Sequence, residues 1–464
     1  MRASLVAVVV AVAAIVTRPS PAAAATYDVD QAVTLAIAQN PDLAIARKKV
    51  EAARGGVIEA RSGYLPSVVS TGLFRERQHQ ADSRLRDEDY NASLRVVQNL
   101  YTGGAVTNQL AIAQLNLEIQ ELELQALTNR VAMDTRVAFN ELLLNRARVR
   151  VREQSVGVLQ EEAKSQQDRF QAGIVGNLNV RRAEVALANE QPELINAETQ
   201  VKNSYLRLAE LFGLDTRANA RTTALFEVAG ELQYKPRHPD LNECLARADT
   251  SRPEIKAREI EVEIEDRQAD LDRSALKPQV EAFSGYEVYN ERDPLVGPEF
   301  NHGYVVGVNA RWNIFDGFAT KGRLQATHAR RDAAAQALQA LRNSVASEVR
   351  SAFLDLQQAE RTLESETKNV QTADESLEIA KGNVDAGLAT QLDMLQAASD
   401  VTRTRTTRLA AIYQHNVALA KLARACAVSP NELDFHPKLT SDRAAKGANH
   451  VVDLAQPPKK LTRK

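Results

Sequence analysis

Residues 91–105 read NASLRVVQNLYTGGA, and residues 304–319 read YVVGVNARWNIFDGFA. In both stretches, apolar and polar side chains alternate over about ten positions. A period of two places the apolar side chains on one face of a β-strand and the polar ones on the other. After Gly103-Gly104 and Gly317 the pattern changes to that of a helix. Each stretch therefore predicts a strand that leads into a helix.

A strand of about ten residues with one apolar face is typical of a membrane barrel, with its polar face toward the lumen. A half-buried strand of a soluble sheet shows the same alternation. The membrane interpretation is favoured because long polar segments join the strands of each pair. Tyr304 and Trp312 also lie near opposite ends of one apolar face, where interfacial aromatic residues belong. We assign four residues to the barrel lumen: Arg95, Asn99, Asn309 and Arg311.

An internal repeat organises the chain. Asn40-Pro41-Asp42-Leu43 returns as Arg252-Pro253-Glu254-Ile255, and Asn99-Leu100-Tyr101-Thr102-Gly103 returns as Asn313-Ile314-Phe315-Asp316-Gly317. Self-similarity over such a distance indicates two tandem modules of one architecture. Each module orders its parts as a helical region, two strands and a long helical hairpin.

The repeat fixes the expected domains. Repeat 1 covers residues 27–213, with strands at about 66–74 and 90–101 and a hairpin at 105–213 whose tip lies near residue 173. Residues 214–239 form a linker. Repeat 2 covers residues 240–428, with strands at about 278–289 and 304–315 and a hairpin at 319–427 whose tip lies near residue 387. Residues 429–464 form a tail that we expect to be largely disordered.

The hairpin helices are too long for a compact domain. No proline occurs in residues 105–172 or 319–386, and sixty-odd helical residues span about 100 Å. Ile112, Leu115, Ile119 and Leu122 form one apolar stripe with three- and four-residue spacing, while Leu117 and Leu124 mark a second. Two stripes indicate neighbours on two sides, as in a ring of helices, whereas a two-stranded coiled coil needs one.

Residues 1–25 predict a secretory signal peptide. Arg2 precedes an apolar run at 5–16, Pro19 and Pro21 follow, and alanines at 22–25 offer cleavage sites. The apolar run is too short to span about 30 Å of hydrocarbon. If the mature chain crosses a membrane, it does so with strands. Four strands cannot close a barrel. Two, three or four chains would therefore have to share one barrel, which would have 8, 12 or 16 strands.

Several functional classes are disfavoured. With 58 Lys and Arg against 60 Asp and Glu, the chain has no global charge that would attract nucleic acid. The seven His are scattered, and the sequence contains no metalloprotease, phosphate-loop or nucleophile-elbow motif. We therefore expect no enzyme activity, cofactor or metal site. Cys244 and Cys426 could form a disulfide in an oxidising compartment, but we favour two small buried residues.

The chain resembles the TolC family of outer-membrane factors. The resemblance covers both modules and depends on residues 40–43, residues 60–66 (ARSGYLP), residues 313–317 and, most specifically, residues 386–397 (AGLATQLDMLQA). It implies a mostly α-helical homotrimer with a 12-stranded outer-membrane β-barrel, continuous with a periplasmic α-helical barrel. It also implies a periplasmic adaptor and an inner-membrane pump as partners, and outer-membrane lipid around the strands.

The same resemblance suggests site residues. Six tip residues are adaptor-contact candidates: Gly173, Ile174, Val175, Gly387, Leu388 and Ala389. Asp393 matches a position where the family places an acid near the tunnel mouth, so we include Asp393, Gln396 and Asn179 in a periplasmic entrance gate. The family often has a second acid where this chain has Gln396, and a basic residue where it has Ala389. Asn179 takes the place of Asp393 in repeat 1.

The sequence thus predicts a passive outer-membrane exit duct of a tripartite efflux or type I secretion system. The alternative is a secreted coiled-coil structural protein or adhesin. That alternative explains the leader and the heptads, but not two strand pairs at equivalent places in two modules. No motif specifies the cargo.

Overall fold

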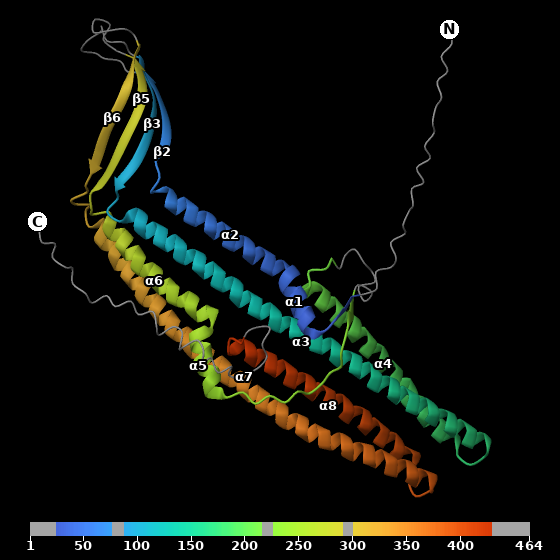
Figure 1. The fold of residues 1–464 in the computed structure, drawn as a ribbon. Helices are drawn as coiled ribbons and strands as arrows, with labels where there is room; N and C mark the ends of the chain where they lie inside the picture. Colours follow the sequence, from blue (N-terminus) through green and yellow to red (C-terminus); the bar gives the residue numbers. More distant parts are fainter. Residues whose placement is uncertain (1–24, 77–87, 216–225, 291–299, 429–464) are drawn as a thin grey trace, which may run out of the picture.

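A computed structural model of the chain describes residues 25–76, 88–215, 226–290 and 300–428. These residues form an elongated molecule, with a curved sheet at one end and two hairpin tips at the other (Figure 1). All but the last residue of the expected leader, and the whole tail at 429–464, lie outside the described residues.

The two repeats contain the same elements in the same order. Repeat 1 consists of α1 (Val29–Gln39), α2 (Pro41–Ser62), β2 (Ser67–Glu76), β3 (Glu88–Tyr101), α3 (Ala105–Gln171) and α4 (Asn177–Leu211). Repeat 2 consists of α5 (Leu241–Ser251), α6 (Pro253–Ser274), β5 (Gln279–Asn290), β6 (Phe300–Arg311), α7 (Ala319–Asp385) and α8 (Gln391–Ala425). Two short strands, β1 (Ala25–Tyr27) and β4 (Phe226–Val228), pair in parallel beside repeat 1.

A four-stranded antiparallel sheet joins the repeats. Its order is β2-β3-β5-β6, so β3 of repeat 1 pairs with β5 of repeat 2. β2 and β6 are its edges, and no strand of the described chain pairs with their outer sides. Residues directly opposite one another share a face of the sheet. Its two faces can therefore be read from the register.

One strand differs from its predicted position. The alternation predicts the last strand at about 304–315, whereas β6 spans Phe300–Arg311. Trp312 follows the strand, and its Nε1 donates to the carbonyl oxygen of Leu276 at 2.9 Å. The Asp316 carboxylate then accepts from the backbone and side chain of Thr320 at 2.8 and 2.5 Å. Such side-chain bonds give the backbone an alternative to the strand ladder, so a turn replaces the strand's predicted end.

The long helices form one curved layer. α3 and α7 have 67 residues each, which span about 100 Å at ~1.5 Å per residue. α2 and α4 both pack along α3, while α6 and α8 pack between α3 and α7 (Figure 1). α3 thus has helical neighbours on two sides, which its two apolar stripes predict. No helix of the described chain is both long and apolar enough to cross a bilayer.

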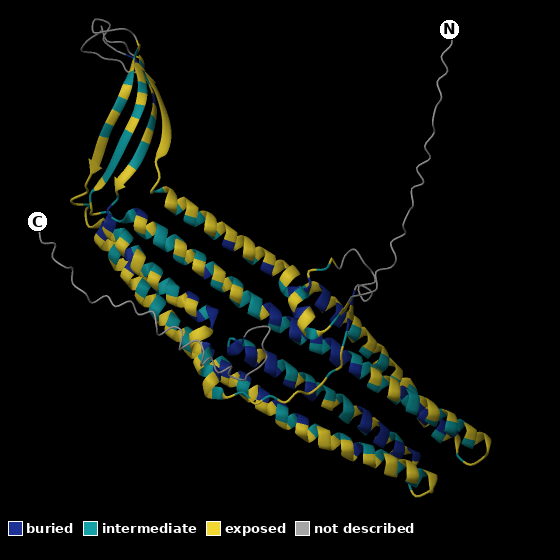
Figure 2. Cartoon of the chain, in the orientation of Figure 1, coloured by how far each residue is buried: buried dark blue, intermediate teal, exposed yellow. Residues whose placement is uncertain are grey.

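The core of each repeat lies where its short first helix crosses the long ones. In repeat 1, α1, α3 and α4 enclose Leu142, Leu208 and Phe212, and Phe226 of β4 seals the cluster. In repeat 2, α5, α7 and α8 enclose the equivalent cluster. Figure 2 shows that buried residues gather at these crossings and along α8, whereas the sheet and the tips are largely exposed. The strand β4 lies within the predicted linker at 214–239. The sequence pattern did not predict this strand.

Candidate functional site

Both hairpin tips have the same glycine-dependent turn. After α3, the backbone N–H of Ile174 donates to the carbonyl of Arg169 at 2.9 Å, and Gly173 adopts φ 74°. After α7, the N–H of Leu388 donates to the carbonyl of Asn383 at 2.8 Å, and Gly387 also adopts φ 74°. This is the Schellman arrangement, which needs a left-handed residue and therefore favours glycine.

The tip turns present apolar side chains to solvent. Ile174 is 72% exposed and Leu388 is 80% exposed, while Val175 and Ala389 are half-buried. Leu178 and Leu392, in the first turn of each return helix, are also exposed. Apolar side chains gathered at the end of a rod are typical of a contact surface. The six predicted adaptor-contact residues thus lie together at one end of the molecule, in two matching turns.

Asp393 takes part in a capping box at the start of α8. Its carboxylate accepts from the backbone N–H and the hydroxyl of Thr390, at 2.8 and 2.6 Å. These hydrogen bonds, first from the side chain and then from the backbone, lower the pKa of the Asp393 carboxyl below its usual 3.8. The carboxylate is exposed, so it combines a structural role with a fixed negative charge at the tip.

The other predicted gate residues make no direct contact with Asp393. Gln396 is exposed and Asn179 is half-buried. Within the described residues, no hydrogen bond joins either side chain to Asp393. The N-cap residue of α4 is Gly176, which has no side chain to cap the helix, so the two tips are chemically unequal.

Polar contacts between the two hairpins form a set that the sequence analysis missed. Near the tips, Arg169 of α3 pairs with Asp385 of α7 at 3.0 Å. Slightly farther along, Nε2 of Gln391 donates to the Glu162 carboxylate at 3.2 Å, and Gln166 donates to the same oxygen at 2.9 Å. The partners in the Arg169–Asp385 and Gln391–Glu162 contacts lie more than 200 positions apart in the sequence. Local spacing carries no signal for such pairs.

A groove of about 780 Å³ continues from these contacts between α3, α7 and α8. Gln154 of α3, Asp374 of α7 and Arg405 of α8 line it, and Arg405 pairs with Asp374 at 2.9 Å. Polar contacts thus link the two hairpins near the tips, and Val156 and Leu159 of α3 and Met394 and Val401 of α8 are buried in the same stretch.

One face of the sheet is polar. Arg95 pairs with Glu287 at 3.0 Å and its guanidinium lies 5.6 Å from the centre of the Phe283 ring. Asn309 donates to Glu281 at 3.0 Å. The register places Asn99 of β3 opposite Glu281 of β5 on this face. It also places Arg311 of β6 opposite Gln279 of β5 on the same face. The four predicted lumen residues therefore share one face, and Glu281 and Glu287 join them.

The opposite face is apolar and exposed. Tyr304, Val306 and Val308 of β6 are 86%, 71% and 65% exposed. The register extends this face across the sheet through Tyr286, Leu94, Val96 and Val68. An apolar surface of this size and continuity is unusual in a water-soluble protein. It has the composition expected of a strand face in contact with lipid.

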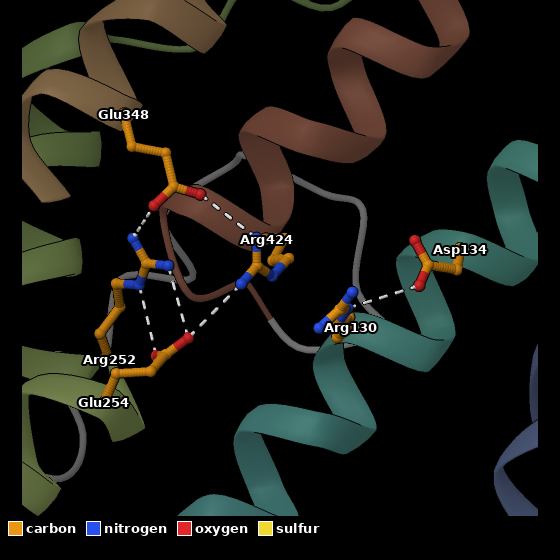
Figure 3. Close-up of polar contacts among 6 residues, drawn as sticks. All are labelled: Arg130, Asp134, Arg252, Glu254, Glu348 and Arg424. Carbon is orange, nitrogen blue, oxygen red and sulfur yellow. Dashed lines mark hydrogen bonds and ion pairs between the residues drawn. The ribbon is translucent and has the colours of Figure 1, made fainter. Parts of the chain in front are cut away.

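A charge cluster around the buried Arg252 lies at the base of the second hairpin. The Arg252 side chain is only 4% exposed and donates to Glu348 of α7 at 2.6 Å and to Glu254 at 3.4 Å. Arg424 of α8 contacts both carboxylates, at 3.3 and 3.6 Å. Figure 3 shows the four side chains converging from the α5–α6 junction, α7 and α8, with the separate Arg130–Asp134 pair of α3 nearby. The cluster thus ties three helices together at one joint.

This architecture is that of outer-membrane channels. The solved structure of the outer-membrane channel OprN has a TM-score of 0.74 at 20% identity, covering 87% of this chain and 91% of that one. The structure of VceC from Vibrio cholerae has a TM-score of 0.71 at 17% identity, covering 86% and 95%. At these identities the likeness shows a shared fold.

Sequence comparison identifies the family. The family described as "Outer membrane efflux protein" matches residues 32–214 and again residues 244–428. The chain belongs to this family, once in each repeat. Among relatives, Protein CyaE of Bordetella pertussis is 23% identical over 410 residues, covering 88% of this chain and 85% of that protein. Outer membrane protein TolC of Vibrio cholerae is 24% identical over 406 residues, covering 83% and 87%.

The predicted class of protein is thereby confirmed. The chain is an outer-membrane exit duct with a helical tunnel in the periplasm. The alternative of a secreted coiled-coil structural protein or adhesin is not supported. The family of this chain and its relatives are channel proteins.

Proposed function

We propose that three copies of the chain form one conduit, a 12-stranded barrel in the outer membrane joined to a periplasmic ring of helices. The observation that carries this proposal is a four-stranded sheet with one apolar face, one polar face and two open edges. An unpaired edge in hydrocarbon leaves backbone groups without hydrogen bonds, which costs several kcal/mol per group. Joining β2 of one chain to β6 of the next removes every edge.

The helices support the same assembly. α3 has neighbours on both sides, whereas the helices that pack against α7 in the described part of the chain are α5, α6 and α8. Exposed apolar residues lie on the outer helices, including Ile58 of α2, Ile195 of α4 and Leu354 of α7. Packing α7 of one chain against α2 and α4 of the next would bury them. Three copies of two repeats then give a ring with approximate sixfold symmetry.

Crosslinking across the open edges tests the number of chains. The variant would carry Ser70→Cys on β2 and Val306→Cys on β6, in a background where the native cysteines are alanine. A flexible bis-maleimide should give a covalent ladder on denaturing gels that ends at three chains. Each single-cysteine variant, treated identically, should give no ladder. A ladder that ends at two or four chains would contradict the trimer.

The tips are the proposed contact with a periplasmic adaptor, through which an inner-membrane pump drives transport. Leu388→Asp and Ile174→Asp place charge on exposed side chains in turns held by backbone bonds, so the fold should persist. Crosslinking of the adaptor should fall at least tenfold, because desolvating a charge is unfavourable. Ile314→Asp, at a site that is 77% exposed but lies between β6 and α7 at the other end of the molecule, is the matched control. Unchanged adaptor crosslinking in both tip variants, with the trimer intact, would exclude the tips.

We also assign Asp393, Gln396 and Asn179 to the entrance of the tunnel. Three copies of one exposed carboxylate at the same depth make a ring of like charge that attracts cations. The polar face of the sheet, with Arg95, Asn99, Asn309 and Arg311, would line the barrel. The duct itself needs no energy source, since it supplies only a path.

A further inference from the structure

The only two cysteines of the chain meet in the core of repeat 2. Cys244 lies on α5, and Cys426 is the residue that follows α8. Both are buried, at 4% and 0% exposure, and both belong to the cluster formed by α5, α7 and α8. Both thiols are free in the structure, and they lie close enough for each to shift the pKa of the other, that of Cys244 downward and that of Cys426 upward.

The internal repeat shows what these positions do elsewhere in the chain. Cys244 is equivalent to Ala32, since both sit four positions after the aspartate that caps their short helix. Cys426 is equivalent to Phe212, since both are followed by a residue of positive φ, Gly213 or Ala427. Ala32 and Phe212 are themselves fully buried in the core of repeat 1. Two positions that are buried in the core of repeat 1 are therefore both cysteine in repeat 2, and cysteine occurs nowhere else in the sequence.

We propose that Cys244 and Cys426 are joined by a disulfide in the mature protein, which staples α5 to the C-terminal end of α8. The helical tunnel lies in the periplasm, a compartment in which disulfides form and persist. Chance placement of two isolated cysteines would rarely bring them together in one core. The bond would close a loop containing most of repeat 2.

The chemistry is a thiol–disulfide exchange with a periplasmic protein that carries a reactive disulfide. One cysteine thiolate attacks that disulfide and releases one donor thiol, and the other cysteine then attacks the mixed disulfide and releases the second. The chain loses two electrons and two protons, and the donor gains both as a dithiol. Oxidation must precede closure of the core, because both cysteines are buried in the folded chain and a donor protein cannot reach them there.

The staple would act at the same joint as the charge cluster around Arg252. Arg424 lies two residues before Cys426, and Arg252 follows the helix that carries Cys244. The ion pairs and the disulfide would together fix the base of the second hairpin. α8 begins at the tip and ends beside Cys426. The disulfide would therefore hold the base of the second hairpin rigid while the tip contacts its partner.

Peptide mapping of the full-length protein tests the bond without any substitution. The protein is exported with its own leader, cells are lysed in N-ethylmaleimide, and the detergent-extracted protein is digested with trypsin without reductant. Peptides 238–247 and 425–438 should appear as one linked species, which dithiothreitol converts into two free peptides. Recovery of both peptides as maleimide adducts would overturn the proposal.

Heat stability of the detergent-solubilised oligomer tests the stapling role. Reduction should lower the dissociation temperature of the wild type by several degrees. It should leave Cys244→Ala/Cys426→Ala unchanged, at a value close to that of the reduced wild type. Equal temperatures for oxidised and reduced wild type would overturn the stapling role. Cys244→Ala introduces the residue found at the equivalent position 32, so the double variant should fold.

Discussion

Replacing Asp393 with asparagine should reduce the preference of the reconstituted channel for cations. The Asp393 carboxylate is exposed and accepts two hydrogen bonds from Thr390, which lower its pKa below 3.8. It is therefore ionised throughout the neutral and mildly acidic range. Asparagine keeps the size of the side chain and one oxygen acceptor, so the change is mainly one of charge.

The size of the effect follows from Coulomb's law. For an assumed distance of about 10 Å from the axis of a trimer, three carboxylates attract a monovalent cation by roughly 1.2 kcal/mol in unscreened water. Screening at about 0.1 M salt reduces this to roughly 0.5 kcal/mol, or about a twofold enrichment of cations. At about 0.01 M salt the enrichment rises to roughly four- to fivefold. The prediction is thus a selectivity that depends steeply on salt.

Reversal potentials in planar bilayers under a salt gradient measure this selectivity. Asp393→Asn should lose most of it at low salt and little at high salt. Thr390→Ala is the matched control, because it removes the cap hydroxyl, at a cost of about 1 kcal/mol to the helix, but keeps the charge. Asn179→Asp adds an acid at the equivalent position of repeat 1 and should strengthen the selectivity.

Unchanged reversal potentials in Asp393→Asn at low salt would refute the gate assignment. Asp393 would then serve only the capping box. A loss of selectivity in Thr390→Ala as large as that in Asp393→Asn would also count against a charge effect. In that case the order of the first turn of α8 would be responsible.

Three further predictions concern stability. Arg252→Met should lower the free energy of unfolding by about 2–4 kcal/mol, because Glu348 and Glu254 lose a buried partner but remain partly solvated. Gly213→Ala should cost about 2–4 kcal/mol, because φ is +68° and a Cβ would lie 2.7 Å from the carbonyl oxygen of Gln39. His415 is fully buried, and burial lowers its pKa below 6.5. As the pH falls, His415 therefore takes up a proton in the unfolded chain before it does so in the folded chain. The free energy of unfolding should decline below about pH 6.5.

Each of these has a control and a measurement. Urea unfolding followed by circular dichroism reports the first two, and Gly157→Ala, in open space within α3, should instead be neutral or slightly stabilising. Arg252→Met or Gly213→Ala with a wild-type midpoint would contradict the packing at those joints. For the third, His415→Gln should flatten the decline between pH 7 and pH 5, whereas His328→Gln, at an exposed site, should not. If His415→Gln loses as much stability between pH 7 and pH 5 as the wild type, groups other than His415 are responsible for the decline.

Local pattern was enough to predict much of this protein. The alternation around Arg95 and Val306 indicates strands, because side chains on a strand repeat with a period of two. The long proline-free runs and the glycines at 173 and 387 indicate helices of about 100 Å and their turns. The recurrence of residues 40–43 at 252–255 shows the duplication. The strand and helix signals depend only on neighbours within a few positions, and the duplication is seen by comparing the sequence with itself.

Tertiary structure decided what lies beside what. The pairing of β3 with β5, the position of β4 in the core of repeat 1 and the contact of Gln391 with Glu162 join residues far apart in the sequence. Trp312 lies beyond its predicted strand because Asp316 and Leu276 offer hydrogen bonds that the alternation cannot reveal. The meeting of Cys244 and Cys426 is of the same kind. Sequence period fixes the direction of a side chain within its own element, whereas only packing selects its partner.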